Sequence, residues 1–314
     1  MRAPPEVLRV LSEGTFCFAA ARTLRGPHLT PLVYALSDGS VWLTTSRRSV
    51  KARAWARDPR FAGLVRRGAE AVAFTGSVRL YDALDPGTWL PAALRGPAIA
   101  AAAARYSARN ARFFAGYALD ARSVPLAWTP PGRVFVEVVP ERAAVLAGPR
   151  VADLWGTWRP AVASRPAFRA RGAPDPLAAL PPDVSGRVGR RGEGAVAVIG
   201  EGGPVVLPAT WASGRWGLLA AVPEAAFGLA AAPREPEVAL AVDRASWWRA
   251  RDMVGFTARG RAAVFVPGRL SSGATSARAR LREMGADEAS VLLRVRPERV
   301  TWWRGWSSGT VEGT

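Results

Sequence analysis

Residues 26–51 read GPHLTPLVYALSDGSVWLTTSRRSVK, and this stretch decides the fold. It contains two β-rich runs, His28–Tyr34 and Val41–Thr45, which the strong hairpin signal Asp38-Gly39 separates. Residues 49–57 predict a short helix, which ends where a proline follows because the residue before proline avoids the α region. We therefore expect a β-hairpin that leads directly into a helix.

Similar β-rich runs lie on both sides of this stretch. Thr15–Ala19 is apolar, residues 72–79 alternate between apolar and polar side chains, and Val134–Val138 repeats that alternation. Between the last two runs, residues 97–119 predict one long amphipathic helix. We therefore expect the first part of the chain to be mainly β with flanking helices, and to end near Gly148.

The second half of the chain repeats the first. Five short segments return in the same order: Gly26–Pro31 as Gly203–Pro208, Val41–Thr44 as Trp216–Leu219, Pro59–Phe61 as Pro236–Val238, Gly76–Leu80 as Gly260–Val264, and Val138–Arg142 as Val295–Arg299. A separation this long predicts a duplicated domain and not a solenoid. Residues 149–184 lose all periodicity and are rich in proline, arginine and tryptophan, which predicts a linker. The expected division is therefore a first lobe over residues 1–148, the linker over residues 149–184, and a second lobe over residues 185–314.

The composition of the 314 residues excludes several classes of protein. With 49% hydrophobic residues the chain can bury a sizeable core, and one cysteine and one histidine exclude an internal disulfide and a Cys/His zinc site. No apolar run is long enough for a membrane-spanning helix, and the first residues lack the apolar core of a secretory signal. We therefore expect a cytoplasmic protein without membrane contact.

The net charge of +18 is typical of proteins that bind nucleic acid. However, the basic residues are arginines spread over the whole chain without a long block, and Lys51 is the only lysine. Together with the abundance of alanine, glycine and proline, this favours codon bias and a generally basic surface. Nucleic-acid binding remains a third class of function, which steeply salt-dependent DNA binding would support.

The turn after the hairpin concentrates groups that suit a phosphate. Hydroxyls come from Thr44, Thr45, Ser46 and Ser49, and positive charge comes from Arg47, Arg48 and Lys51. Backbone N–H groups at the start of a helix carry partial positive charge, and basic side chains are unfavourable there unless an anion compensates them. We therefore predict a phosphate-ester site at this turn. The alternative is an ordinary helix N-cap with a solvated basic first turn.

Residues 11–80 resemble the pyridoxamine 5'-phosphate oxidase-like superfamily of FMN-binding split β-barrels. The segments that carry the resemblance are Gly26–Leu32, Val41–Ser46, Ser49–Lys51, Arg57–Arg60 and Phe74–Arg79. The resemblance implies a Greek-key β-barrel with flanking helices. Because members of this family are generally homodimers, a fused duplicate implies two tandem split β-barrel lobes that form a pseudo-dimer within one chain.

The resemblance also implies which residues hold the cofactor. The flavin phosphate would be held by Thr45, Ser46, Arg47, Ser49 and Lys51, with Thr44 and Val50 also in the cofactor site, and the flavin ring would lie against Thr30, Pro31 and Leu32. Two positions depart from the family pattern. Val50 stands where a base is common, and an asparagine that usually follows the lysine is replaced near Ala54.

The corresponding turn of the second lobe differs in charge. Its residues, Ala220–Phe227, include no base and no hydroxyl, and one of them is an acid. Such a turn repels a phosphate, so we expect one competent cofactor site per chain and a degenerate second site. Trp248 and Trp303 are candidates for the wall of the flavin or substrate pocket; the alternative is that they are simply buried between the lobes.

The sequence shows no constellation for acid–base or nucleophilic catalysis, which agrees with a protein whose cofactor performs the chemistry. The leading hypothesis is a flavin-dependent oxidoreductase in which FMN, bound between the lobes, transfers a hydride to or from a small-molecule substrate. The cofactor could instead be the 8-hydroxy-5-deazaflavin coenzyme, and the protein could instead be a non-catalytic carrier of flavin or haem. Neither the catalytic residues nor the substrate follow from the sequence, and the fused chain could be monomeric.

Overall fold

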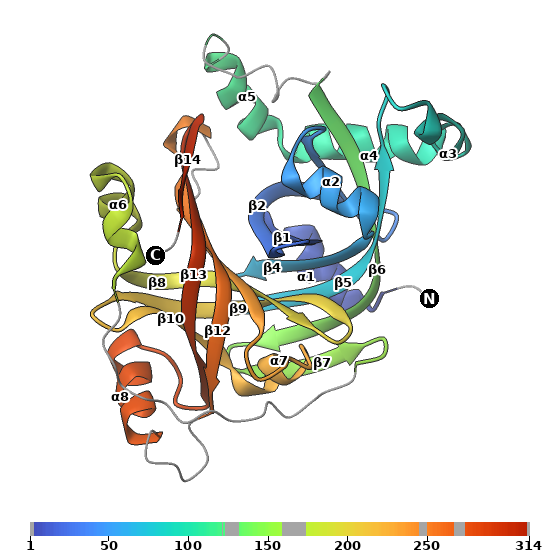
Figure 1. Ribbon diagram of the computed structural model, residues 1–314. Helices are drawn as coiled ribbons and strands as arrows, with labels where there is room; N and C mark the ends of the chain where they lie inside the picture. The colour runs from blue at the N-terminus through green and yellow to red at the C-terminus, as the bar shows by residue number, and fades with distance from the viewer. Residues whose placement is uncertain are drawn as a thin grey trace.

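The computed structural model describes residues 3–120, 122, 132–158, 174–244, 250–266 and 274–312. Within these ranges the chain builds two antiparallel sheets, one from each half (Figure 1). The first comprises β1 (Phe16–Thr23), β2 (Gly26–Ser37), β3 (Ser40–Ser46), β4 (Arg60–Arg67), β5 (Glu70–Tyr81), β6 (Arg133–Ala147) and β7 (Arg150–Trp155). The second comprises β8 (Arg191–Gly200), β9 (Gly203–Gly214), β10 (Gly217–Pro223), β11 (Glu237–Arg244), β12 (Val254–Phe265), β13 (Ser290–Arg304) and β14 (Ser307–Glu312).

Each sheet closes on itself. In the first, β3 pairs with β2 and also with β6, so the order β3-β2-β1-β4-β5-β6 forms a ring to which β7 is added. In the second, β10 pairs with β9 and with β13, and the order β10-β9-β8-β11-β12-β13 forms the same ring with β14 added. The identical order confirms the predicted mainly β fold and its tandem duplication.

Helices flank both barrels. They are α1 (Pro5–Glu13), α2 (Val50–Arg57), α3 (Trp89–Leu94), α4 (Gly96–Arg109), α5 (Ala111–Leu119), α6 (Pro182–Val188), α7 (Glu224–Gly228) and α8 (Ala274–Met284). Helices α3, α4 and α5 follow one another along the top of the first barrel in Figure 1. Among the described residues, no helix is long and apolar enough to cross a membrane.

The expected hairpin leads directly into the expected helix. The turn between β2 and β3 consists of Asp38 and Gly39, with φ angles of 49° and 74°. Positive φ at both positions matches the twist of the strands, and aspartate and glycine tolerate it. Because this tight turn fixes the register, β3 delivers its last residue, Ser46, directly to the turn before α2.

The lobes share one hydrophobic core. A large buried cluster combines first-lobe residues such as Leu29 and Leu64 with second-lobe residues such as Leu207 and Leu240. A separate cluster, which includes Phe74, fills the first barrel. The Thr257 hydroxyl also donates a buried hydrogen bond of 2.8 Å to the Leu29 carbonyl. The two barrels are therefore one packed body.

Two details differ from the sequence analysis. The single helix expected over residues 97–119 is wrong, because the chain forms α4 and α5 with a break at Asn110, whose buried amide donates to the carbonyls of Tyr34 and Tyr106. The alignment of Trp216 with Val41 is also wrong. Gly214 pairs with Gly217 as Ser37 pairs with Ser40. Trp216 in the second lobe is therefore equivalent to Gly39 in the first lobe, and Leu218 is equivalent to Val41.

Residues 149–184, the predicted linker, contain ordered structure at both ends. Strand β7 (Arg150–Trp155) extends the first sheet, a short 3-10 helix spans Pro176–Ala179, and α6 begins at Pro182. Trp158 packs against the shared core and its indole donates to the carbonyl of Ala143 at 3.3 Å. Residues 159–173 lie outside the described residues.

Candidate functional site

The middle of β2 is less buried than Leu29 and Tyr34 on either side of it. Each residue of Thr30–Val33 is only half-buried, which includes the predicted ring contacts Thr30, Pro31 and Leu32. The Thr30 hydroxyl itself is enclosed and has no hydrogen-bond partner among the described residues. Since buried polar groups are almost always paired, this hydroxyl is available to a ligand.

The turn after β3 is held by its own hydroxyls. Ser49 caps α2 by accepting a hydrogen bond of 3.1 Å from the Ala52 N–H, and the Ser49 and Thr45 hydroxyls are 3.0 Å apart. The N–H of Ser49 donates to the carbonyl of Ser46 at 2.9 Å. These contacts fix the turn, so Thr45, Ser46 and Ser49 shape the predicted phosphate site.

The two arginines of the turn point to different surroundings. Arg47 forms an ion pair with Asp82, in which its Nε lies 2.5 Å from the carboxylate, and Arg48 is exposed. Val50 is 41% exposed. Its backbone N–H lies at the first position of α2, where helices leave N–H groups without an intrahelical partner. An anion at this turn could therefore contact the backbone N–H of Val50 but not its apolar side chain.

Lys51 follows this turn, and the described residues provide it with no partner. Its side chain is half-buried, and among the described residues its ammonium makes no hydrogen bond or ion pair. Burial and the nearby positive charge of Arg133 lower the pKa of Lys51 to about 8. His28 lies close enough that burial, Lys51 and Arg259 lower the pKa of its imidazole to about 3. We call Thr30, the turn Ser46–Ser49, Lys51 and Arg133 the first-lobe site.

Two cations near this site were not predicted from the sequence. Arg133 begins β6 opposite Ser46, and its guanidinium donates to the Thr44 hydroxyl and carbonyl, with Nη2 to Oγ1 at 2.7 Å. The Thr44 hydroxyl also lies 3.1 Å from the Tyr106 hydroxyl, so it positions Arg133. Only the closure of the barrel brings Arg133 to this turn.

Arg259 comes from the second lobe. It stands directly before the bulge at Gly260, and its enclosed Nε has no hydrogen-bond partner among the described residues. Glu298 and Glu312 lie near it as well as Arg25 and Arg299. The match of Gly76 with Gly260 in the sequence repeat was the signal that could have identified this position.

The predicted tryptophans have different outcomes. Trp303, on β13, is half-buried and donates a hydrogen bond of 3.0 Å from its indole to the Asp243 carboxylate. Burial raises the pKa of Asp243 to about 7. Trp248 lies outside the described residues.

The second lobe lacks the cations of the first-lobe site. At the end of β10, Pro223 takes the place of Ser46, and it pairs with Ser290 where Ser46 pairs with Arg133. The short helix α7 then begins with Glu224. In the described ranges there is also no group of three or more His, Cys, Asp or Glu side chains that could hold a metal ion.

The arrangement of strands agrees with the fold that the resemblance implied. The chain is a tandem pair of split β-barrels. No protein-family model matches the sequence of this tandem barrel, and no curated protein matches it.

Three solved structures that match it cover just under half of this chain each. A conserved hypothetical protein from Mycobacterium tuberculosis is 23% identical, with 47% of this chain and 86% of that chain covered and a TM-score of 0.33. A pyridoxamine 5'-phosphate oxidase-related, FMN binding protein from Nostoc punctiforme is 18% identical, with 47% and 87% covered and a TM-score of 0.33. An F420 reductase is 18% identical, with 46% and 99% covered and a TM-score of 0.29. At these identities and TM-scores, none of them assigns a cofactor or a reaction to the tandem barrel.

Proposed function

We propose that the tandem barrel is a flavin-dependent oxidoreductase that binds one FMN at the first-lobe site. The observation that carries this proposal is the Lys51 ammonium, which is half-buried beside Arg133 and has no acid partner among the described residues. A partly buried cation among like charges is stabilised when an anion binds, and a phosphate monoester accepts several charge-assisted hydrogen bonds at once.

The residues of the first-lobe site fit such a ligand. Lys51 and the free N–H groups at the start of α2 would hold the phosphate, and Arg133 would add charge from β6. The unpaired Thr30 hydroxyl and the half-buried strand beside it would contact the ring. The second lobe contributes Arg259 near His28, which supports a site that borders both lobes.

A bound flavin supplies hydride transfer, and the chain supplies binding and orientation. His28 is neutral at physiological pH because burial and two cations lower its pKa to about 3, so it adds no charge to the site. The ion pair of Arg47 with Asp82 keeps the turn in place. A deazaflavin carries a phosphate too, so the same residues suit it, and the experiment must distinguish the two.

The first test is a titration of the purified protein with FMN and with riboflavin, which lacks the phosphate. We expect one FMN per chain, and riboflavin binding weaker by about tenfold or more because the charge-assisted contacts are lost. Lys51→Ala should remove most of this difference. Arg53→Ala, which removes an exposed base from the same helix, is the matched control and should not.

Electron transfer to an added acceptor distinguishes an oxidoreductase from a non-catalytic carrier. After dithionite reduction, an oxidoreductase should pass its electrons to an added dye or quinone, whereas a carrier should not. Mass spectrometry of the cofactor from freshly purified protein distinguishes FMN from the deazaflavin. A protein that binds neither cofactor would refute the proposal.

A further inference from the structure

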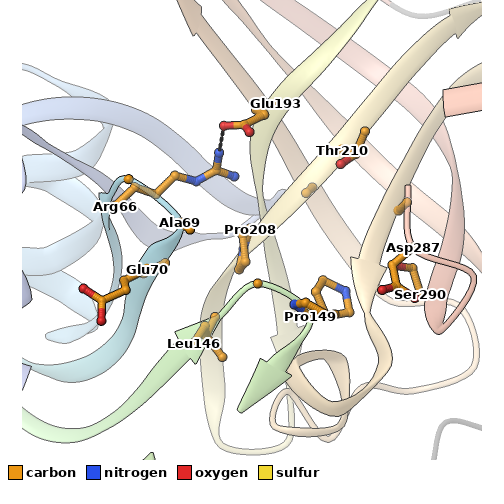
Figure 2. A pocket seen from close by; sticks show the side chains of 16 residues that line it. Arg66, Ala69, Glu70, Leu146, Pro149, Glu193, Pro208, Thr210, Asp287 and Ser290 are labelled. Carbon is orange, nitrogen blue, oxygen red and sulfur yellow. Dashed lines mark hydrogen bonds and ion pairs between the residues drawn. The ribbon is translucent and has the colours of Figure 1, made fainter. Parts of the chain in front are cut away.

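A cavity of about 330 Å³ lies between the two lobes (Figure 2). The first lobe contributes the ends of β4 and β6, with Arg66 and Leu146, and the second contributes Glu193 and the middle of β9. Asp287 and Ser290, at the start of β13, complete the wall. We call this cavity the second-lobe pocket.

The second-lobe pocket lies where the repeat places the counterpart of the first-lobe site. Pro208, which lines the pocket, holds the same position in β9 as Pro31 does in β2. Pro223 and Ser290 are paired across β10 and β13, as Ser46 and Arg133 are across β3 and β6. The pocket therefore lies at the position equivalent to the first-lobe site, with Pro223 and Ser290 where the first lobe has Ser46 and Arg133.

The charge of this pocket is opposite to that of the protein. The chain has 43 basic and 25 acidic residues, yet the pocket is lined by three acids, namely Glu70, Glu193 and Asp287, and by one base, Arg66. Glu193 pairs with Arg66 at 2.7 Å, and Glu70 pairs with Arg9 at 2.9 Å outside the pocket. One acid is left with its charge uncompensated.

That acid is Asp287. Its carboxylate accepts a hydrogen bond of 2.7 Å from the N–H of Ala289, and among the described residues it has no cationic partner. Beside it, the Ser290 side chain is 3% exposed, lines the pocket, and makes no hydrogen bond within the described ranges. The Ser290 hydroxyl faces the pocket and the Asp287 side chain is exposed beside it, so together they present two acceptors to a ligand.

We propose that the second-lobe pocket binds a small organic cation without phosphate, namely a primary ammonium carried on a flat apolar group. The ammonium lies at Asp287 and Ser290. Figure 2 shows these two residues on one side of the pocket and Arg66 with Glu193 on the other, with Pro208 and Pro149 between them.

The opposite side of the pocket suits the apolar end of such a ligand. Leu146, Pro149 and Pro208 form an apolar middle that a flat ring can contact. The enclosed Nε of Arg66 has no hydrogen-bond partner in the described part of the chain and can donate to an oxygen on the ring. A net charge of +18 repels cations over most of the protein, so selectivity for a cation must come from these local acids.

The test uses the full-length protein and two probes of the same shape. Tryptamine carries an ammonium on an indole, and indole-3-acetate carries a carboxylate on the same ring. By calorimetry or ligand-observed NMR, we expect one tryptamine per chain and no saturable binding of indole-3-acetate. Asp287→Asn should weaken tryptamine by about fivefold, the effect typical of one partly solvated ion pair. Glu288→Gln removes a charge from the same loop but not from the pocket, and should leave binding unchanged.

A second variant tests the location of the ligand without changing the charge of the pocket. Thr210→Trp fills the pocket from β9 and should abolish tryptamine binding, while circular dichroism verifies the fold. Equal binding of both probes, absence of tryptamine binding, or insensitivity to Asp287→Asn and Thr210→Trp would each overturn the proposal. So would a titration that ends at two FMN per chain. Because tryptamine is titrated with and without FMN, a failure of the first-lobe site is seen separately.

Discussion

Burial and the charge of Arg133 lower the pKa of the Lys51 ammonium to about 8. An unfolded chain keeps this lysine protonated to near its ordinary pKa, so between the two values the unfolded state binds more protons than the folded state. The free energy of unfolding of the free protein therefore rises with pH over this window, since deprotonation removes an unfavourable buried charge. A phosphate bound at the site interacts with the charged form of Lys51. The stability that the phosphate adds is therefore lost as the pH rises and Lys51 loses its proton.

This linkage predicts how FMN affinity depends on pH. Between pH 7 and 8 we expect little change, and above about pH 8 the affinity should fall by up to about tenfold per unit, because each binding event must restore one proton to Lys51. Fluorescence titrations from pH 7 to 9.5 measure this. Lys51→Arg keeps its charge throughout the range, so its profile should be flat. A steep profile in that variant would assign the titration to another group.

The Thr30 hydroxyl predicts a conflict between stability and binding. It is enclosed and no described residue gives it a hydrogen bond, and such a group destabilises the folded state by about 1–3 kcal/mol. Thr30→Val, which has the same shape, should therefore raise the free energy of unfolding of the free protein by about 1 kcal/mol and weaken FMN binding. Urea unfolding and FMN titration of one preparation test both effects. Lower stability together with unchanged binding would show that the hydroxyl serves the fold instead.

At the scale of elements, each lobe carries a β-bulge at the same point. The register of β5 and β6 shifts between Thr75 and Gly76, and that of β12 and β13 shifts between Arg259 and Gly260. A Cβ at Gly76 would lie 2.1 Å from the Val139 carbonyl oxygen, and one at Gly260 would lie 2.0 Å from that of Arg296. Both bulges therefore require glycine. They also aim the residue before them, which in the second lobe is Arg259.

We expect Gly76→Ala and Gly260→Ala to reduce the free energy of unfolding by similar amounts, about 2 kcal/mol or more, because backbone must shift at both bulges. Gly186→Ala in α6 is the control. A Cβ there meets no atom within 4 Å, so alanine should stabilise the helix by about 0.5–1 kcal/mol. Denaturant unfolding of the three variants provides the comparison. A mild effect at one bulge alone would contradict their equivalence.

Local patterns predicted these elements well where one side of a strand or helix is buried. The hairpin, α2 and the order of the repeat followed from turn residues and alternation. The break at Asn110 did not, because it depends on a hydrogen bond to Tyr34, far away in the chain. The contribution of Arg133 and Arg259 was missed for the same reason. Barrel closure and lobe packing bring them near the turn, and no local pattern encodes either.

At the scale of the whole molecule, the shared core predicts cooperative unfolding. Leu64, on β4, is fully buried in the cluster that also fills the second barrel. Leu64→Ala should lower the free energy of unfolding by about 2–5 kcal/mol, and it should destabilise both lobes together. Calorimetry should show one transition for the wild type and for the variant. Leu94→Ala, which alters a side chain that is 78% exposed, should change neither. Two separate transitions would mean that the barrels unfold independently.

The covalent connection between the barrels also changes what a single substitution does. In a pair of identical chains, every replaced residue appears once in each of two equivalent sites. Here Arg66 borders the second-lobe pocket, and Arg259 lies near His28. A substitution in one lobe can therefore change one of these neighbourhoods while the other stays as it was, which two copies of one chain do not allow.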